Sequence, residues 1–244
     1  RLASGITGKG RMKEPEIILE TAMYLLGKEG DLQSQKIIIT AGGTRELIDP
    51  VRYIGNRSSG KMGYAIATAA RDRGANVSLV SAKHVSLKVP FGVEHHSVET
   101  SSDLEKKILF NAEKADVIIM AAAVCDFKPI QISDQKIKKS TQKNMILELE
   151  QTPDILKQLA DKDVTKIAFA AETENIIENA KIKLKNKNVD MIVANDVSRD
   201  DIGFNSDNNQ VTLIKKNGSI KELPVMPKLE LAHILLDETI SLIK

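Results

Sequence analysis

The chain of 244 residues lacks several features by which large classes of proteins are identified. Its single cysteine, Cys125, excludes a disulfide framework and a zinc site of several thiolates, and favours a reducing compartment. No apolar run approaches the roughly 20 residues that a membrane span needs, and the amino-terminal segment has no apolar stretch typical of a signal peptide. We therefore expect a cytoplasmic protein with no membrane partner.

Aromatic residues are also scarce, and neither sign of charge is in large excess. Phe, Tyr and Trp make up 3% of the residues, and Trp is absent, so stacking of nucleic-acid bases on an aromatic surface is disfavoured. The 35 Lys and Arg residues nearly balance the 33 Asp and Glu residues, which is atypical of proteins that neutralise a nucleic-acid backbone. With 42% hydrophobic residues, the composition predicts a globular core and no nucleic-acid partner.

Short β-branched or apolar runs alternate with segments of helical period along most of the chain. Strands are predicted at residues 36–41, 76–81, 93–98, 117–123, 166–171 and 191–195. Helices are predicted at residues 16–28, 61–73, 101–114, 155–162, 175–187 and 229–243. The pattern predicts an α/β fold, with a mostly parallel sheet between helices and a late β-hairpin around Asn217-Gly218. Its ligands should lie beyond the carboxyl ends of the strands.

Helix starts and long loops refine this prediction. We expect Ser101, Ser102 or Asp103 to cap helix 101–114, and Thr152 to cap helix 155–162 with Pro153 at its first position. Residues 44–59 are predicted to form a loop. Residues 126–144 are polar and lysine-rich, and we interpret them as a mobile flap, since long loops in α/β domains are usually functional.

The glycines after the first predicted strand suggest a phosphate site, and a dinucleotide fold is one candidate. Its G-x-G-x-x-G fingerprint is missing, because Gly42 and Gly43 are adjacent, and the second strand ends without an acidic residue for ribose. An NAD site is therefore disfavoured. Tyr24 and Lys28 have the spacing of some dehydrogenases, but they precede the first strand on an apolar helix, where core packing is commoner.

A P-loop is the second candidate for this segment. Residues 55–62, GNRSSGKM, match G-x-x-x-x-G-K, but Met62 stands where Ser or Thr should hold Mg²⁺. Ser and Gly at a helix N-terminus still offer backbone N–H groups and a positive dipole end to an anion. A triphosphate or pyrophosphate site is the hypothesis, and an ordinary Ser/Gly helix start is an alternative of roughly equal weight.

Cationic side chains lie near this segment and in later ones. Arg45, Arg52, Arg57 and Asn56 offer donors to phosphate or carboxylate, whereas each alone also fits a solvated loop. In the flap, Lys136, Lys138 and Lys139 offer point charges, and Lys183 and Lys187 share one helical face. Solvated surface is the alternative for these lysines. Cys125 has no neighbouring base in the sequence, so a nucleophilic role for it is disfavoured. The histidines show no metal spacing, so we predict no metal-ligating cluster of protein side chains.

Several motifs, taken together, identify a family. They are ITAGGTRELIDPVRYIGNRSSGKMGYAIA, AAAVCDFKP, KIKK, TPDIL, AFAAET, VANDVS and GFNSDNN, in this order and spacing. The chain from about residue 35 to 244 resembles the phosphopantothenoylcysteine synthetase domain of the bifunctional coenzyme A biosynthesis proteins of bacteria and archaea. The resemblance implies a Rossmann-like three-layer fold.

The segment 1–34 resembles the end of the companion flavin-dependent decarboxylase domain, with its substrate-clamp loop and a linker helix. Ser4 stands where the clamp usually has a catalytic cysteine. Because the rest of that domain is missing, FMN would belong to the missing part, and no decarboxylase activity is assigned to this chain.

The resemblance implies a phosphopantothenate–cysteine ligase. The carboxylate of 4′-phosphopantothenate attacks the α-phosphate of CTP, held with Mg²⁺, and gives an acyl-cytidylate and pyrophosphate. The amine of cysteine then displaces CMP to form the amide. Family members form homodimers through part of the sheet, a role for which the late hairpin is suited. Alternatives are the same ligation with ATP, and a non-catalytic nucleotide-binding module.

Residue roles follow from the same resemblance. Asn56 would hold the carbonyl of the acyl-nucleotide, Arg52 would support the same loop, and Lys136 would serve the second half-reaction. Asp126, residues 152–155 and Phe169 would surround the cytidine, and Lys136, Lys183 and Lys187 would bind phosphate. Cys125 stands where the family has alanine before an aspartate. The residues expected to bind substrate or nucleotide are Gly43, Thr44, Ser58, Ser59, Gly60, Gly63, Met120, Ala122, Asp126, Thr152, Pro153, Asp154, Ile155, Phe169, Lys183 and Lys187.

Overall fold

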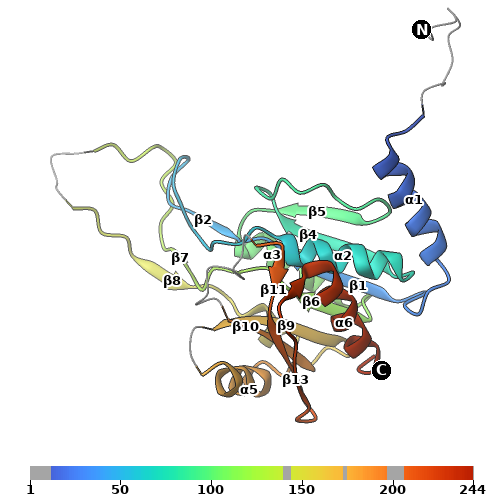
Figure 1. The fold of residues 1–244 in the computed structure, drawn as a ribbon. Coiled ribbons are helices and arrows are strands. Elements are labelled where there is room, and N and C mark those ends of the chain that lie inside the picture. Colours follow the sequence, from blue (N-terminus) through green and yellow to red (C-terminus); the bar gives the residue numbers. More distant parts are fainter. Residues whose placement is uncertain (1–11, 140–143, 173–174, 197–205, 244) are drawn as a thin grey trace, which may run out of the picture.

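The computed structural model describes residues 12–139, 144–172, 175–196 and 206–243, which form an α/β fold around one large sheet (Figure 1). The strands from β10 to β5 are parallel, and β12 and β13 are antiparallel. The predicted fold class is thus confirmed. In spatial order the sheet contains β13 (Ile220–Glu222), β12 (Val211–Lys215), β10 (Met191–Asp196), β9 (Thr165–Glu172), β6 (Val117–Met120), β1 (Lys36–Ala41), β4 (Asn76–Ala82) and β5 (Glu94–Val98).

The central strands are apolar along their whole length because helices cover both faces of the sheet. Ile37 and Ile39 of β1 face one core cluster, whereas Ile38 between them faces the other, as the two-residue period of a strand requires. All four residues of β6 are buried. Such continuous burial is typical of a parallel strand inside a three-layer fold.

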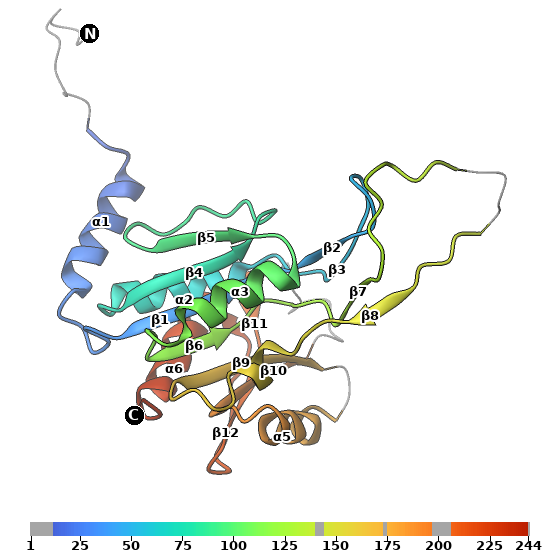
Figure 2. The same cartoon turned by 180° about the vertical axis from the view of Figure 1, so that it is seen from behind.

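Each face of the sheet has its own set of helices (Figure 2). α2 (Lys61–Asp72) and α6 (Lys228–Ile240) pack on one face, and α1 (Pro15–Gly27) lies beside α2. α3 (Ser101–Ala112), α4 (Ile155–Gln158) and α5 (Ile176–Asn186) pack on the other. The three layers of the predicted fold are therefore present.

The chain reverses its direction across the sheet between β1 and β6. It first runs from β1 to β4 and β5, then returns to the other side of β1 and continues through β6, β9 and β10. In open α/β sheets, ligands bind beyond the carboxyl ends of the strands at such a switch point. The segments that follow β1 and β6 are therefore where a site is expected.

The two predicted loops contain strands, which corrects the prediction. Within residues 44–59, β2 (Arg45–Leu47) pairs with β3 (Tyr53–Gly55) as an antiparallel hairpin. The predicted flap begins with β7 (Phe127–Pro129), which pairs with β8 (Leu149–Gln151). We call residues 126–151, of which 126–139 and 144–151 are described, the arm, because this segment projects from the sheet (Figure 1). Its mobility stays a prediction.

Both predicted helix caps were wrong by one or two residues. Thr100 caps α3: its side chain accepts from the Asp103 N–H, and the Asp103 carboxylate accepts from the Thr100 N–H. Asp154, not Thr152, caps α4 by accepting from the Lys157 N–H. Thr152 instead donates its hydroxyl to the Cys125 carbonyl at 2.6 Å, and α4 ends at residue 158, before the predicted end.

The late hairpin is confirmed and is followed by short pairings. β12 and β13 enclose the turn in which Gly218 has a φ of 89°, a conformation that glycine adopts without strain. β11 (Asn208–Asn209) pairs with β14 (Met226–Pro227) just before α6. This pairing brings the segment around residue 208 to the start of α6.

The Tyr24 and Lys28 pair has a packing role. The Tyr24 ring meets the Phe91 ring edge-on with 5.4 Å between centroids, and the Lys28 Nζ lies 5.4 Å from the Tyr24 ring. Tyr24 is half-buried, Lys28 is exposed and neither belongs to a core cluster, so the pair packs at the surface and the prediction of core packing is wrong. Of the helices in the described ranges, none is both long and apolar enough to cross a bilayer. The predicted clamp, including Ser4, lies outside the described residues.

Candidate functional site

The N-terminus of α2 lies at the switch point, next to the end of β1. Gly60 caps it with a φ of 78° and without any capping side-chain hydrogen bond, and the Lys61 N–H points back to Ser59 Oγ at 3.4 Å. Gly63, one turn into the helix, packs on β1: a Cβ there would lie 2.6 Å from the Ala41 Cβ. The missing side chain thus lets α2 approach the sheet and places its N–H groups at the sheet edge.

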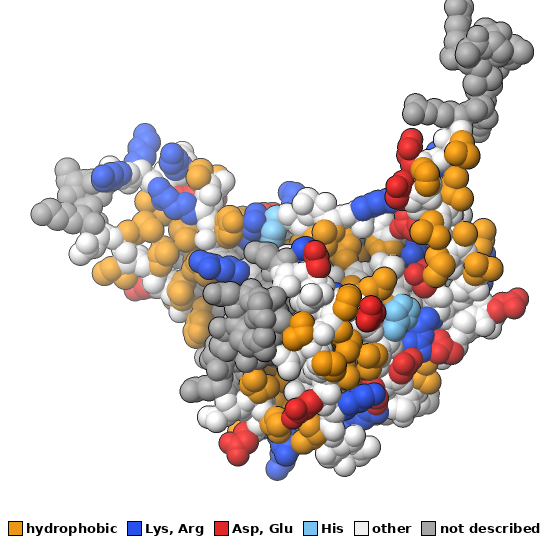
Figure 3. Space-filling model, in the orientation of Figure 1, with side chains coloured by type: hydrophobic (Ala, Val, Ile, Leu, Met, Phe, Trp, Pro, Cys, Tyr) orange, Lys and Arg blue, Asp and Glu red, His pale blue; other side chains and the backbone are white. Residues whose placement is uncertain are grey.

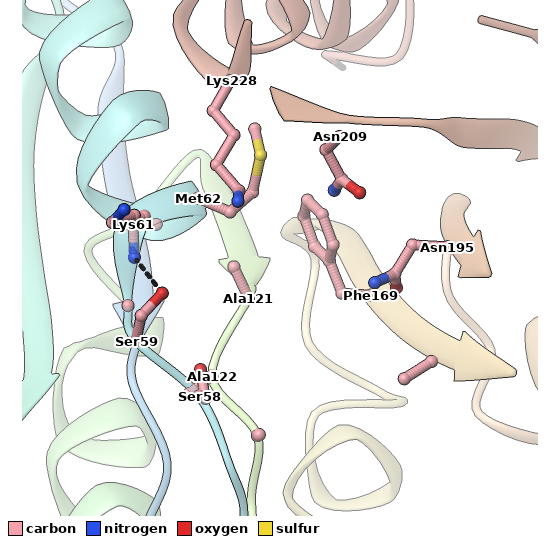
Figure 4. A pocket seen from close by; sticks show the side chains of 14 residues that line it. Ser58, Ser59, Lys61, Met62, Ala121, Ala122, Phe169, Asn195, Asn209 and Lys228 are labelled. Carbon is pink, nitrogen blue, oxygen red and sulfur yellow. Dashed lines mark hydrogen bonds between the residues drawn. The ribbon is translucent and has the colours of Figure 1, made fainter. Parts of the chain in front are cut away.

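A cavity of about 110 Å³, the first cavity, opens at this helix end (Figure 4). Segments that follow β6 and parts of β9 and β10 form its opposite wall, and α6 contributes one lysine. It brings together the predicted residues Ser58, Ser59, Gly60, Gly63, Ala122 and Phe169. Its other lining residues are Lys61, Met62, Ala121, Ala123, Ala171, Asn195, Asn209 and Lys228.

Lys228 was missed by the sequence analysis. Only 7% of it is exposed, and its Nζ donates to the carbonyls of Ser206 and, at 3.4 Å, of Asn208. Burial lowers its pKa, as does the charge of Lys61, while Asp207 acts in the opposite direction. The lysine reaches down from α6 toward Met62 at the start of α2 (Figure 4).

A signal for Lys228 was present in the sequence. The inward positions of α6 are 231, 232, 235, 236 and 239, and extending this pattern back by three residues places position 228 on the same face. A lysine on the buried face of a helix is rare unless it has partners. Asn195 and Asn209, whose side chains flank the Phe169 ring, had no comparable signal (Figure 4).

Lys61, which also lines the first cavity, contacts the same segment as Lys228, residues 206–208. Its Nζ lies 2.7 Å from the Asp207 Oδ1, and this contact lowers the pKa of Asp207. Asp207 is bonded to α6 as well, because its carbonyl accepts from the Lys228 N–H at 3.0 Å. Two lysines thus lie on one side of the first cavity with one carboxylate next to them.

A second cavity of about 430 Å³ lies on the other side of the segment that follows β6. It brings together the predicted residues Met120, Asp126, Thr152, Pro153, Asp154, Ile155 and Lys187. The Thr152 N–H donates to the Asp126 carbonyl at 2.9 Å, and the Lys187 Nζ lies 3.8 Å from an Asp154 oxygen. Phe169 was expected in this group, but the structure places it in the first cavity.

Asn56 is bonded to the segment that separates the two cavities, although it lines neither of them. Its exposed side chain donates from Nδ2 to the Val124 carbonyl at 3.0 Å, and Val124 lines the second cavity. Gly43 is needed for this arrangement, since a Cβ there would lie 2.5 Å from the Asn56 carbonyl oxygen. The buried Thr44 accepts from the Cys125 N–H at 2.9 Å. Gly43 and Thr44 therefore lie behind the cavity walls.

Cys125 packs as a structural residue in this wall. Its Sγ donates to the Thr44 carbonyl at 3.3 Å, and only 3% of the residue is exposed. Burial raises the pKa of its thiol, which disfavours the thiolate. This agrees with the expectation that Cys125 is not a nucleophile.

Three further predicted residues lie outside both cavities. Arg52 pairs with Asp49 and donates to the Ile137 carbonyl, Lys136 is exposed on the arm, and Lys183 lies on α5. The structure therefore brings Lys187 to a cavity wall but not Lys136 or Lys183. Direct roles for these three residues stay predictions.

Among the described residues, no group of three or more His, Cys, Asp and Glu side chains is arranged to hold a metal ion. Mg²⁺ bound together with a nucleotide needs less, because it usually takes one or two carboxylates plus phosphate oxygens and water. The exposed carboxylate of Asp126 on the second cavity fits that need.

Comparison with known proteins gives a consistent result. Residues 32–242 match the family described as DNA/pantothenate metabolism flavoprotein C-terminal domain. The chain is 45% identical over 248 residues to the "Coenzyme A biosynthesis bifunctional protein CoaBC" of Bacillus subtilis (strain 168), and 42% identical over 244 residues to that of Escherichia coli (strain K12). These matches cover 100% and 98% of this chain but 61% and 60% of the relatives, so the chain spans about three fifths of their length.

Solved structures agree with the sequence relatives. The fold is similar to the crystal structure of the C-terminal domain of the "Coenzyme A biosynthesis bifunctional protein CoaBC", with a TM-score of 0.74 and 41% identity over 86% of this chain and 96% of that one. A Streptococcus pneumoniae "DNA/Pantothenate Metabolism Flavoprotein" has the same fold, with a TM-score of 0.74, 24% identity, and coverage of 85% of this chain and 99% of that one.

Proposed function

Since the chain belongs to the DNA/pantothenate metabolism flavoprotein C-terminal domain family, we propose that it is a phosphopantothenate–cysteine ligase of coenzyme A biosynthesis. The names of its relatives support the pathway, and the sequence motifs support the reaction. Residues 35–244 would be the ligase, and residues 1–34 would be the end of a decarboxylase domain and its linker helix. FMN would be bound only by that decarboxylase domain.

The observation that carries the proposal is the pairing of two anion-binding elements across the first cavity. The N-terminus of α2 presents backbone N–H groups and its positive dipole end, and Lys228 presents a buried ammonium from α6. A highly charged substrate such as a nucleoside triphosphate or a phosphorylated acid matches this arrangement. The carbonyls of Ser206 and Asn208 already accept from Lys228, and an anion would add the negative charge that these carbonyls do not carry.

The second cavity is suited to the rest of the nucleotide. Its wall of backbone groups and small side chains at residues 152–155 would hold the cytidine, with Lys187 at its edge. Asp126 would hold Mg²⁺ that arrives with CTP, and this ion would neutralise charge on the phosphates. A substrate that spans both cavities would pass the segment between them, residues 121–125, to which Asn56 is hydrogen-bonded.

The reaction then needs positioning more than covalent catalysis. The phosphopantothenate carboxylate forms a bond to the α-phosphorus of CTP, and pyrophosphate leaves. The amine of cysteine next forms a bond to the acyl carbon, CMP leaves, and the amine proton is released. Asn56 Nδ2 would donate to the acyl oxygen, and Lys136 would stabilise the negative charge that develops in the second step.

The test is a reconstitution with purified protein, Mg²⁺, CTP, 4′-phosphopantothenate and cysteine. We expect CMP and the amide product in equal amounts, and no CMP without phosphopantothenate. Replacing CTP with ATP decides between the two nucleotides. Binding of CTP without any CMP release would contradict the ligase and favour a non-catalytic nucleotide-binding module.

A homodimer is part of the proposal, and the arm is its best-suited surface. Exposed hydrophobic side chains gather there together with basic ones (Figure 3). They include Phe127 (46% exposed), Ile130 (52%), Ile132 (59%), Met145 (52%), Ile146 (87%) and Leu149 (41%). The late hairpin, favoured from the sequence, exposes Ile220 on β13. Large apolar patches on a projecting element are typical of interfaces between protein chains.

A further inference from the structure

We propose that Asp49 is a positioning residue that locks the turn bearing Arg52 to the segment of the arm bearing Lys136. The inference rests on the proposed function, in which both cations serve the reaction. Asp49 lies in the turn between β2 and β3, and Lys136 lies far along the chain in the arm. Neither motif alone indicates that one carboxylate connects them.

Asp49 uses both of its oxygens for this connection. Oδ1 accepts from the N–H groups of Val51 at 2.7 Å and Arg52 at 2.8 Å, which fixes the turn. Oδ2 accepts from the Arg52 guanidinium at 3.0 Å and from the Ile137 N–H at 3.1 Å. Because the side chain is fully buried, these contacts are shielded from water. Hydrogen bonds to an ionised group are strong in such an interior.

The Arg52 guanidinium completes a closed arrangement with the arm. It donates to the Ile137 carbonyl at 3.1 Å while also bonding Asp49, so both backbone groups of Ile137 are held by the turn. A further contact joins the same two segments, since the Ser133 N–H donates to the Ile48 carbonyl at 3.0 Å. The backbone next to Lys136 is thereby fixed, although the lysine side chain itself is exposed.

This arrangement needs an ionised carboxylate. Burial raises the pKa of Asp49, but the N–H donors of Val51, Ile137 and Arg52 and the charge of Arg52 outweigh it, and the pKa is lowered overall. At neutral pH the group therefore only accepts hydrogen bonds. An asparagine would keep the size, but its NH₂ group would lie either against the Arg52 guanidinium and the Ile137 N–H or against the N–H groups of Val51 and Arg52.

The first measurement is hydrogen exchange of the unliganded full chain. In Asp49→Asn we expect exchange of the Ile137 amide to accelerate at least about tenfold, because a neutral amide replaces the charged acceptor and opposes N–H donors in either orientation. The matched control is Asp103→Asn, which removes a carboxylate that accepts from the Thr100 N–H within the capping box of α3. In this control variant, exchange of the Ile137 amide should be unchanged. Unchanged exchange in Asp49→Asn would overturn the inference.

The second measurement separates positioning from general stability. Asp49→Asn should lower kcat for amide formation at least about tenfold while changing KM for CTP less than about threefold. Asp103→Asn should change neither by more than about twofold. A native kcat in Asp49→Asn, or an equal loss in both variants, would contradict a positioning role.

A further variant keeps the test valid if Asp49→Asn does not fold. Arg52→Lys leaves the backbone contacts of Asp49 in place, but an ammonium cannot bridge Asp49 and the Ile137 carbonyl in the same plane. Exchange at residues 136–138 should again rise, and unchanged exchange would contradict the inference. If the unaltered chain released no CMP, the proposed function would fail, whereas the exchange results would still decide whether Asp49 holds the arm.

Discussion

The first cavity is walled by helix ends and strand ends of the central fold, whereas the arm projects from the sheet and carries exposed side chains (Figures 1 and 3). Around the cavity, Lys228 and Gly63 are buried and packed against neighbouring elements. On the arm, Lys136 is exposed, and its position depends on hydrogen bonds to the β2–β3 turn. Substrate binding in the first cavity should therefore depend on the packing of its walls. The chemical step should depend on the few hydrogen bonds that hold the arm to the β2–β3 turn.

Asn56 is bonded to Val124, between the segment that lines the first cavity and the start of the arm, so its substitution should have the largest effect. In Asn56→Asp, a negative charge replaces the Nδ2 donor that now bonds the Val124 carbonyl, next to anionic substrates. We expect turnover to fall by at least about 100-fold, as when an oxyanion donor is removed. CMP release measures this.

The control for Asn56 is Asn111→Asp. Asn111 also donates its Nδ2 to a carbonyl, that of Lys107 at 2.8 Å, but it lies on α3 away from both cavities. Turnover of this variant should be normal. Equal losses in the two variants would contradict the role of Asn56.

Lys228→Met tests whether the first cavity binds an anionic substrate. Loss of the buried ammonium should raise KM for a phosphate-bearing substrate by about 10- to 100-fold, since hydrogen bonds to charged groups are worth roughly 1.5–3 kcal/mol. The matched control is Lys166→Met: Lys166 is also buried and donates to three carbonyls, but it lies outside both cavities. It should lose stability and keep KM. Equal KM values for Lys228→Met and the unaltered chain would contradict anion binding.

The pH dependence of stability gives a second readout for Lys228. Its pKa is lowered in the folded chain, chiefly by burial, so the unfolded chain binds more protons between the folded and unfolded pKa values. The free energy of unfolding should therefore rise as pH increases through that window toward the usual pKa of a lysine. Denaturant titrations at several pH values should show this rise in the unaltered chain relative to Lys228→Met.

Gly63→Ala tests the packing of α2 on β1 and should have a moderate effect. The new Cβ would lie 2.6 Å from the Ala41 Cβ and 2.7 Å from the Thr40 carbonyl oxygen, so the helix must move away from the sheet. Such overpacking costs about 1–3 kcal/mol. Denaturant unfolding should show this loss together with weaker CTP binding. Native stability would contradict the close helix–sheet contact.

A smaller effect on stability is expected on the arm. Ile146 is 87% exposed, so Ile146→Ser should change the free energy of unfolding of the chain by less than about 0.5 kcal/mol. Association should nevertheless weaken if the arm forms the dimer interface. Sedimentation at several concentrations measures the association. A dimer that is as stable as that of the unaltered chain would show that the interface lies elsewhere.

The main strands were predictable from the sequence because each is a compact apolar run. Val117 to Met120 shows this most clearly, as all four residues are buried in the middle of a parallel sheet. The β2–β3 and β7–β8 pairings were not predictable in this way. Residues 45–47 and 149–151 are too short and too polar to show a period, and the partner strand of β7 lies about 20 residues away.

The candidate site was predictable in part for a similar reason. The glycine and serine residues 58–60 form a local motif, and the structure places them together at the start of α2. Lys228 enters the same cavity from the end of the chain, and its contribution depends on the packing of α6. The link between Asp49 and Ile137 joins residues distant in the sequence, so only the folded chain shows it.

The most direct test of the ligase is the release of pyrophosphate in the absence of cysteine. With Mg²⁺ and CTP, the account predicts that adding 4′-phosphopantothenate produces a rapid burst of about one pyrophosphate per active site, since the acyl-cytidylate stays bound. Adding cysteine should then release CMP in the same amount. Pyrophosphate release that does not depend on phosphopantothenate, or no release at all, would contradict the account.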